Sequence, residues 1–354
     1  MTIFASFPRS KANPCLWLLA ALLGPIVGAW PVAGRAQGVA PPAVAAPAVV
    51  APAAPAPVVP PNPGAPKEFP DPVDITLPSG LRATYFASPA TLTDANNRKY
   101  ERKNAVPVIL LHAFKGSRGD FADMALYLQH LGHAVMVPDL RGHGESLKVK
   151  NPATGKAQEY KADSLRLVDY EVMVTYDLEA LKTYLREKNN AGELNIDKLC
   201  VVGVEMGSVL AVNWTAVDWA WPVLATGKQG QDVKAMVLIS PEWTWKGFTI
   251  NKALDFPPIT RELSVLIMAG AGNSSSIADA KRLKTRFDKF HPTPPPDEAK
   301  EKQTLFLVPL NTTLAGGKLL GEKSLNLNKI IGQFIDWRLV NQNIPWAERK
   351  DALP

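Results

Sequence analysis

The sequence predicts an α/β fold with a mainly parallel, doubly wound sheet. From residue 67 onward, segments of strand character alternate with segments of helical periodicity, which is typical of a parallel sheet with helices on both faces. The inner strand segments are continuous apolar runs, as expected where both faces of a sheet are covered. No internal repeat is visible, and 354 residues with 46% hydrophobic content suffice for one large core.

Each element is expected from its local pattern. The sheet opens with an antiparallel hairpin, because the segments DITL and LRATYFAS flank the turn signal Pro78-Ser79-Gly80. Parallel strands are expected at 106–113, 133–140, 197–202, 234–241, 263–270 and 304–310. Helices are expected at 121–131, 168–187, 208–219, 277–287 and 324–339, with a polar loop at 147–163.

The N-terminus has the pattern of a secretory signal peptide, predicted over residues 1–36. Arg9 and Lys11 precede an apolar run, and small residues lead to a cleavage site after Ala36. Pro25 and the shortness of the apolar run argue against the alternative, an uncleaved membrane anchor. We therefore expect an exported protein of the periplasm, the cell envelope or the exterior, which touches a membrane only if the signal is retained.

A proline-rich linker is expected to separate this signal from the domain, residues 67–354. Residues 37–66 hold ten prolines and no charge, so they predict either an extended spacer or a disordered tail. The formal charge of +6 falls to +3 without residues 1–36, which carry three basic side chains and no acid. That excess is too small to indicate a nucleic-acid partner. Cys200 alone remains, so no internal disulfide is possible, and its apolar strand predicts a buried, inert thiol.

Gly203-Val204-Glu205-Met206-Gly207 is the most informative motif, because it lies where a predicted strand runs into a predicted helix. A Gly-x-Ser-x-Gly sequence at such a junction forms a strained turn that lifts a serine hydroxyl above the sheet. Here the glycines are present and Glu205 stands in the place of the serine. The motif therefore predicts the turn without its usual nucleophile.

Three segments together resemble the α/β-hydrolase superfamily, and the resemblance covers about residues 72–340. They are VILLHAFKGS, which is similar to a strand and its oxyanion loop, VPDLRGHGES, and VVGVEMGS, the degenerate elbow. The chain looks most similar to the group of serine aminopeptidases and monoacylglycerol lipases. Because little sequence separates LISPEW from LSVLIM, the resemblance implies no large cap domain.

The resemblance also implies positions for the catalytic groups. Glu205 occupies the nucleophile position and Asn273 the position of the orienting acid. No histidine follows the last predicted strand, where the base is usually found. The backbone N–H groups of Phe114 and Met206 correspond to the donors of the oxyanion hole. Removing a triad serine or histidine slows catalysis on the order of a million-fold, so ordinary serine hydrolysis is not expected.

Each histidine has a structural interpretation, and His143 is the least improbable substitute for the missing base. The chain holds five histidines: His112, His130, His133, His143 and His291. Glu205 itself could act as a carboxylate nucleophile only with such a base. Ser208 lies in the first turn of the helix, so its hydroxyl should point away from the elbow. Alternatively, the Glu205 carboxylate fills the oxyanion hole and pairs with Lys115, or it is simply solvated.

Tryptophans gather in the sequence around the elbow helix and the strand that follows it. Trp214 and Trp219 are expected to serve packing, whereas Trp243 and Trp245 either pack or line a pocket at the sheet edge. The sequence shows no metal-ligand spacing, phosphate-binding loop or dinucleotide fingerprint, so no metal or cofactor is expected.

These observations leave three hypotheses. The first is an exported protein that keeps the fold, lacks the catalytic groups and binds a small apolar ligand or a protein partner. The second is a serine- or carboxylate-type hydrolase with rearranged residues, and the third is a purely structural envelope protein.

Overall fold

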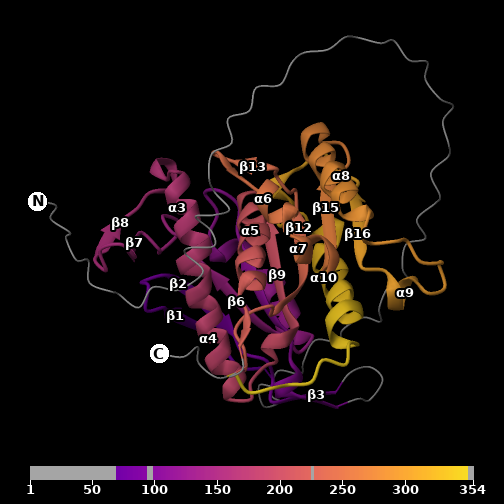
Figure 1. Cartoon of the computed structure of the whole chain (residues 1–354), viewed down its shortest axis with the longest axis horizontal. Coiled ribbons are helices and arrows are strands. Elements are labelled where there is room, and N and C mark those ends of the chain that lie inside the picture. The colour runs from indigo at the N-terminus through magenta and orange to yellow at the C-terminus, as the bar shows by residue number, and fades with distance from the viewer. Residues whose placement is uncertain (1–68, 94–98, 225–226, 350–354) are drawn as a thin grey trace, which may run out of the picture.

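An eight-stranded sheet runs through the middle of the molecule, with helices on both of its faces (Figure 1). The computed structural model describes residues 69–93, 99–224 and 227–349. The predicted signal peptide and proline-rich linker lie outside these residues. The predicted sheet and its covering helices are both present.

The strand order is β1-β2-β6-β5-β9-β12-β15-β16. β1 and β2 form the expected antiparallel hairpin, β2 pairs antiparallel with β6, and the remaining neighbours are parallel. β6 and β9 flank β5, so the strand order reverses there, which is where open α/β sheets place their ligands. The strands are β1 (Val73–Thr76), β2 (Arg82–Phe86), β5 (Pro107–Leu111), β6 (Ala134–Pro138), β9 (Leu199–Val204), β12 (Val233–Ile239), β15 (Ser264–Gly270) and β16 (Leu305–Leu310).

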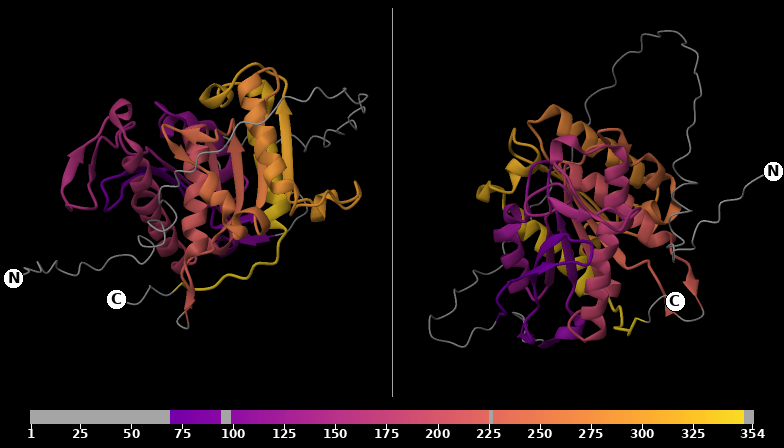
Figure 2. Two further views of the ribbon diagram at one scale, coloured as in Figure 1. Left: turned by 45° about the horizontal axis from the view of Figure 1, so that its top comes forward. Right: turned by 90° about the vertical axis from the view of Figure 1, so that its left-hand side faces the viewer.

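Helices cover both faces of the sheet, as Figure 2 shows from two further sides. α2 (Ala122–His130) and α10 (Leu327–Ile335) pack on one face. The opposite face carries α3 (Leu167–Val172), α4 (Leu178–Asn190), α5 (Met206–Ala220), α6 (Asn251–Asp255), α7 (Pro257–Arg261) and α8 (Ser274–Asp288). Alternate strand residues serve the two cores: Val108 and Leu110 face the first, and Ile109 and Leu111 the second.

Small elements complete the chain between these layers. Four two-stranded ladders are formed by β3 (Thr91–Thr93) with β4 (Lys99–Glu101), β7 (Lys148–Lys150) with β8 (Ala157–Glu159), β10 (Val223–Leu224) with β11 (Gly227–Lys228), and β13 (Thr244–Trp245) with β14 (Phe248–Thr249). A short helix, α9 (Ala299–Lys302), precedes β16.

Two predictions about elements were wrong in detail. The polar loop expected at 147–163 contains the β7–β8 hairpin, in which Val149 is buried beneath polar neighbours. The single helix expected at 168–187 is divided into α3 and α4 by a π-helical turn, Met173–Asp177. That turn lets Asp177 face inward toward Arg141, a contact over 36 residues that no periodicity reveals.

The segment after β6, Asp139 to Ser146, is held by its own polar side chains. The Asp139 carboxylate accepts hydrogen bonds from the backbone N–H groups of Arg118 (2.7 Å) and Glu145 (2.9 Å). Ser146 Oγ accepts from the N–H of Arg82 at 2.9 Å. These contacts give the DLRGHGES sequence a structural role, since they fix the end of β6 against β2 and the loop after β5.

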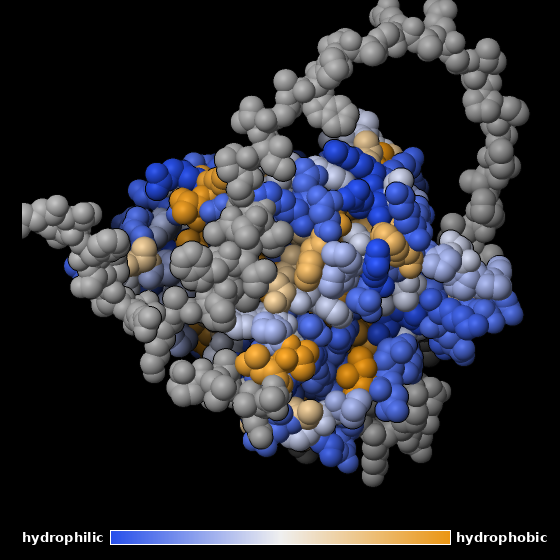
Figure 3. Space-filling view, viewed as in Figure 1, coloured by the Kyte–Doolittle hydropathy of each residue, from blue (hydrophilic) through white to orange (hydrophobic). Residues whose placement is uncertain are grey.

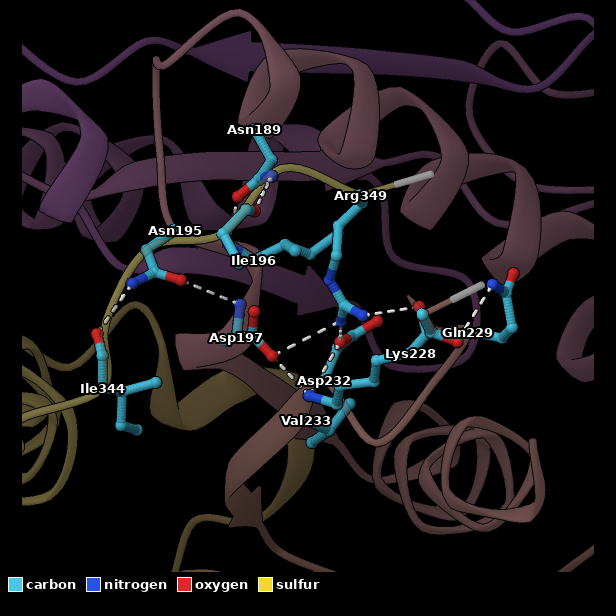
Figure 4. Close-up of polar contacts among 12 residues, drawn as sticks. Asn189, Asn195, Ile196, Asp197, Lys228, Gln229, Asp232, Val233, Ile344 and Arg349 are labelled. Carbon is cyan, nitrogen blue, oxygen red and sulfur yellow. Dashed lines mark hydrogen bonds and ion pairs between the residues drawn. The ribbon is translucent and has the colours of Figure 1, made fainter. Parts of the chain in front are cut away.

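The last described residues bind to the segments that lead into β9 and β12 (Figure 4). Arg349 forms ion pairs with Asp232 and with Asp197 (3.4 Å), and its Nη1 donates to the carbonyl of Lys228 at 2.7 Å. Asn195 Nδ2 donates to the carbonyl of Ile344 at 3.0 Å. The segment that holds Ile344 and Arg349 is therefore bound to the folded domain. No helix in the described ranges has the length and apolarity needed to span a membrane.

Candidate functional site

The elbow predicted at residues 203–207 is formed as expected. Glu205 joins β9 to α5 with φ 53° and ψ −113°, a backbone conformation that L-residues rarely adopt. Its N–H donates to the carbonyl of Ile239 at 3.0 Å. A Cβ atom on Gly203 would lie 2.4 Å from the carbonyl oxygen of Gly207, and one on Gly207 would lie 2.2 Å from that of Leu111. Both positions therefore require glycine.

The Glu205 side chain turns toward the loop that follows β16. A Cβ atom on Gly316 would lie only 2.6 Å from Glu205 Oε1, so the carboxylate rests against the backbone of that loop. The N–H of Gly316 is bound to Ser240 Oγ at 2.9 Å. Within the described residues the Glu205 carboxylate makes no hydrogen bond or ion pair, and partial burial raises its pKa. The glutamate thus fills the space between the elbow and the loop where the family's base is expected.

The expected contacts of Glu205 with the oxyanion donors are missing. No hydrogen bond joins its carboxylate to the N–H of Phe114 or Met206 in the part of the chain that the structure describes. Lys115, the expected partner, instead pairs with Asp163 at 2.9 Å. The hypothesis of a Glu205–Lys115 plug was therefore wrong.

Asn273 and Ser208 both serve the structure around the elbow. Asn273 is the N-cap of α8, where its side-chain oxygen accepts from the N–H of Ser276 at 3.0 Å. Its Nδ2 reaches the carbonyl of Thr313 at 3.4 Å. The Ser208 hydroxyl is buried and donates to the carbonyl of Gly203 at 2.7 Å, so it points away from the elbow as predicted.

His143, the proposed substitute base, is buried behind Phe114. Its Nδ1 contacts the carbonyl of Arg141 at 3.0 Å, and its ring packs on those of His112 (5.1 Å between centroids) and Phe114 (5.8 Å). Burial lowers the pKa of His143, and Lys246 lowers it further. No contact joins His143 to Glu205 in the described residues, so the structure does not bring these two candidates together.

The other histidines also have structural surroundings. His130 packs on Phe69, His291 bridges Thr304 and Thr260, and His133 is buried. In the ranges that the structure describes, none of the five contacts Glu205.

His112 locks the loop after β5 to the end of β6 in its neutral form. Its Nε2 accepts from the N–H of Leu140 at 3.0 Å, so Nδ1 carries the proton and donates to the carbonyl of Ala113 at 2.7 Å. Complete burial lowers the pKa of His112 to about 4. Protonation would place two N–H groups face to face at Leu140.

We expect this histidine to make the fold acid-sensitive. A base with a depressed folded pKa stabilises the native state fully above the unfolded pKa of about 6.5, and this stabilisation is lost as the pH falls toward 4. The difference in free energy of unfolding between the wild type and His112→Gln should therefore shrink by about 3 kcal/mol between pH 7 and pH 4. Urea denaturation at several pH values measures it. A difference that stays constant over this range would show that His112 does not titrate with folding.

The sequence did not reveal a second carboxylate beside Glu205. Glu242, which follows β12, has its pKa raised to about 7, first by burial and then by the charges of Glu205 and Asp279. Glu242 makes no hydrogen bond or ion pair within the described residues. In the sequence, the only indication that Glu242 belongs to the site was its place after a predicted strand. Its proximity to Glu205, 37 residues earlier, depends on the pairing of β9 with β12.

Two of the four tryptophans near the elbow, Trp214 and Trp219, were expected to serve packing, and the structure agrees. Trp214 is buried, and its Nε1 donates to Glu179 at 2.8 Å; the Nε1 of Trp219 donates to the carbonyl of Val233 at 2.8 Å. Both serve packing. Trp245 packs on Phe114 with 5.0 Å between ring centroids, whereas Trp243 lines a groove. Among the described residues no cluster of histidine, cysteine or acidic side chains could hold a metal ion.

Comparison with known proteins agrees with this architecture. Residues 106–261 match a family model described as alpha/beta hydrolase fold, and this segment includes the loop after β5, the elbow and Glu242. The chain has the α/β-hydrolase fold. No curated protein matches its sequence.

Solved structures of similar shape are only distantly related in sequence. They include dipeptidyl peptidase 4 of Porphyromonas gingivalis (12% identity, TM-score 0.49, 77% of this chain and 36% of that one). An acylaminoacyl peptidase of Pyrococcus horikoshii gives 10% identity and a TM-score of 0.48 over 79% of this chain and 44% of that one. A predicted CIB-like hydrolase of Thermoplasma acidophilum gives 14% identity and a TM-score of 0.44 over 75% of this chain and 98% of that one. The chain spans little more than a third of the length of the Porphyromonas peptidase, and none of these activities transfers to it.

Proposed function

We propose that this is an exported α/β-hydrolase-fold protein that has lost hydrolytic chemistry and binds a ligand or partner at the carboxyl edge of its sheet. One observation carries the proposal: the Glu205 carboxylate rests against Gly316, in the loop where the family's base is expected. The elbow is retained as a backbone structure, but Glu205 stands in place of the nucleophile, and no histidine follows β16, where the base is expected.

Hydrolysis at this elbow would need a nucleophile and a base within hydrogen-bond reach of each other. Glu205 has no such partner among the described residues, and burial raises its pKa, which favours the protonated and less nucleophilic form. Without a base, an ester formed on Glu205 would have no group to activate the hydrolytic water. Asn273 is neutral and already caps α8. Asn273 therefore has a structural role and does not serve as an orienting acid.

The edge is nevertheless suited to binding. Glu205 and Glu242 are partly buried acceptors without donors in the described chain, and such groups favour a ligand that brings N–H, O–H or ammonium donors. Phe114 and Trp245, which pack on each other in the segments that follow β5 and β12, provide partly exposed aromatic surface. We infer a ligand with an apolar body and at least one donor group, which also fits a side chain of a protein partner.

The absence of catalysis can be tested by the turnover of short-chain nitrophenyl esters. The wild type, Glu205→Gln and the control Glu262→Gln, which changes an exposed glutamate at the end of α7, should all hydrolyse these esters at the rate of buffer alone. Turnover by the wild type and Glu262→Gln that disappears in Glu205→Gln would instead establish a rearranged hydrolase and overturn the proposal.

A further inference from the structure

A groove with a volume of about 640 Å³ lies between α6–α7 and α8, beside the carboxyl edge of the sheet. In Figure 3 the surface over α8 is largely hydrophilic. The lining residues are Trp243, Asn251, Leu254, Asp255, Pro257, Thr260, Arg261, Arg282, Thr285, Arg286, Lys289 and Phe290. The volume is in the range of small-molecule sites.

The groove has a large excess of positive charge. Four of its side chains are cationic and one, Asp255, is acidic. Asp255 pairs with Arg286, which leaves Arg261, Arg282 and Lys289 without an ion pair to any described residue. Three cations gathered around one concave surface repel one another, and a bound anion relieves that repulsion.

Two of the guanidinium groups are held in place by aromatic rings. Arg282 lies 3.7 Å from the ring centroid of Trp243, and the indole N–H of that ring is itself anchored on Asn251 Oδ1 at 2.7 Å. Arg261 lies 4.6 Å from the ring centroid of Phe290. A guanidinium stacked by its face keeps its edge N–H groups available, and such a fork matches the oxygens of a phosphate.

We propose that this groove binds a diphosphate group, either free or carried on a small organic molecule. A diphosphate supplies enough oxygens and charge for the three unpaired cations, and Leu254 and Pro257 offer apolar surface to an attached organic body. The site is separate from the acidic pair at the elbow, because no residue of that pair lines the groove. The inference goes beyond the proposed function and does not depend on it.

Isothermal titration of the full chain with pyrophosphate and with ADP tests this site. Both probes should bind the wild type, and Arg282→Gln should weaken both at least tenfold. The matched control is Lys281→Gln, an exposed lysine on the same helix that does not line the groove; it should change binding less than twofold. Affinity should also fall when salt is raised from 50 to 200 mM.

The two probes identify the source of the group. Tighter binding of ADP than of pyrophosphate supports an organic diphosphate, and equal binding supports a free one. The proposal is overturned if neither probe binds the wild type at millimolar concentration, or if Lys281→Gln weakens binding as much as Arg282→Gln. Thermal unfolding of both variants should match the wild type, which excludes a loss of binding through misfolding.

Discussion

Replacing Asp177 by asparagine should lower the free energy of unfolding by about 3–5 kcal/mol. Asp177 and Arg141 are both completely buried and form a two-point ion pair, from Nε to Oδ2 and from Nη2 to Oδ1, each at 2.8 Å. Arg141 also stacks on Tyr160 and donates to the carbonyl of Lys150. Asparagine keeps the shape of the carboxylate but leaves the guanidinium charge buried without compensation. Urea denaturation of both proteins measures the difference.

A surface pair provides the control for this prediction. Lys284 and Asp288 lie one turn apart on α8 at 2.6 Å and are partly exposed, so Asp288→Asn should change stability by no more than about 0.5 kcal/mol. The double variant Arg141→Met with Asp177→Leu should recover much of the loss, because no buried charge remains. If Asp177→Asn is as mild as Asp288→Asn, the buried pair does not hold the segment after β6 in place.

Gly207→Ala should be as damaging, through sterics alone. The added methyl group would lie 2.2 Å from the carbonyl oxygen of Leu111. The methyl carbon is attached directly to the backbone of α5 and the oxygen belongs to the backbone of β5, so neither can rotate away. α5 must then separate from β5, which should destabilise the fold by about 3 kcal/mol or more. We expect a large drop in the midpoint of thermal unfolding, or failure to obtain soluble protein.

Gly321→Ala is the matched control, because the nearest atom to its added methyl would be 3.9 Å away. This variant should remain within about 0.5 kcal/mol of the wild type. A Gly207→Ala protein with wild-type stability would mean that α5 does not approach β5 as closely as the elbow requires.

The fold could be predicted because its signals are local. The apolar runs that became β5, β6, β9, β12 and β15 are continuous in the sequence, and the turn at Pro78-Ser79-Gly80 fixes the opening hairpin. The β7–β8 hairpin was missed because its three-residue strands are mostly polar, with only Val149 buried. The π-helical turn was missed because Asp177 turns inward to meet a partner from a different part of the chain.

The backbone of the candidate site could be predicted from the sequence, but the contacts of its side chains could not. The glycines around Glu205 indicate the elbow, since a tight strand-to-helix turn needs them at that spacing. The contact of Glu205 with Gly316 and its closeness to Glu242 arise from the order of strands in the sheet. Gly316 lies over a hundred residues from Glu205 in the sequence, and Glu242 lies 37 residues from it. Lys115 was expected to pair with Glu205 because it lies in the loop after β5, next to the predicted oxyanion hole. In the structure Lys115 instead pairs with Asp163, which lies in the segment after β8.

The central claim is that no base serves the elbow, so restoring the nucleophile alone should not restore reactivity. Intact-mass measurement of the Glu205→Ser protein after incubation with a fluorophosphonate probe tests this directly, with wild-type protein beside it and folding checked by circular dichroism. The account predicts that neither protein gains the mass of the probe. A Glu205→Ser protein labelled stoichiometrically at residue 205 would reveal an activating base at the carboxyl edge and contradict it.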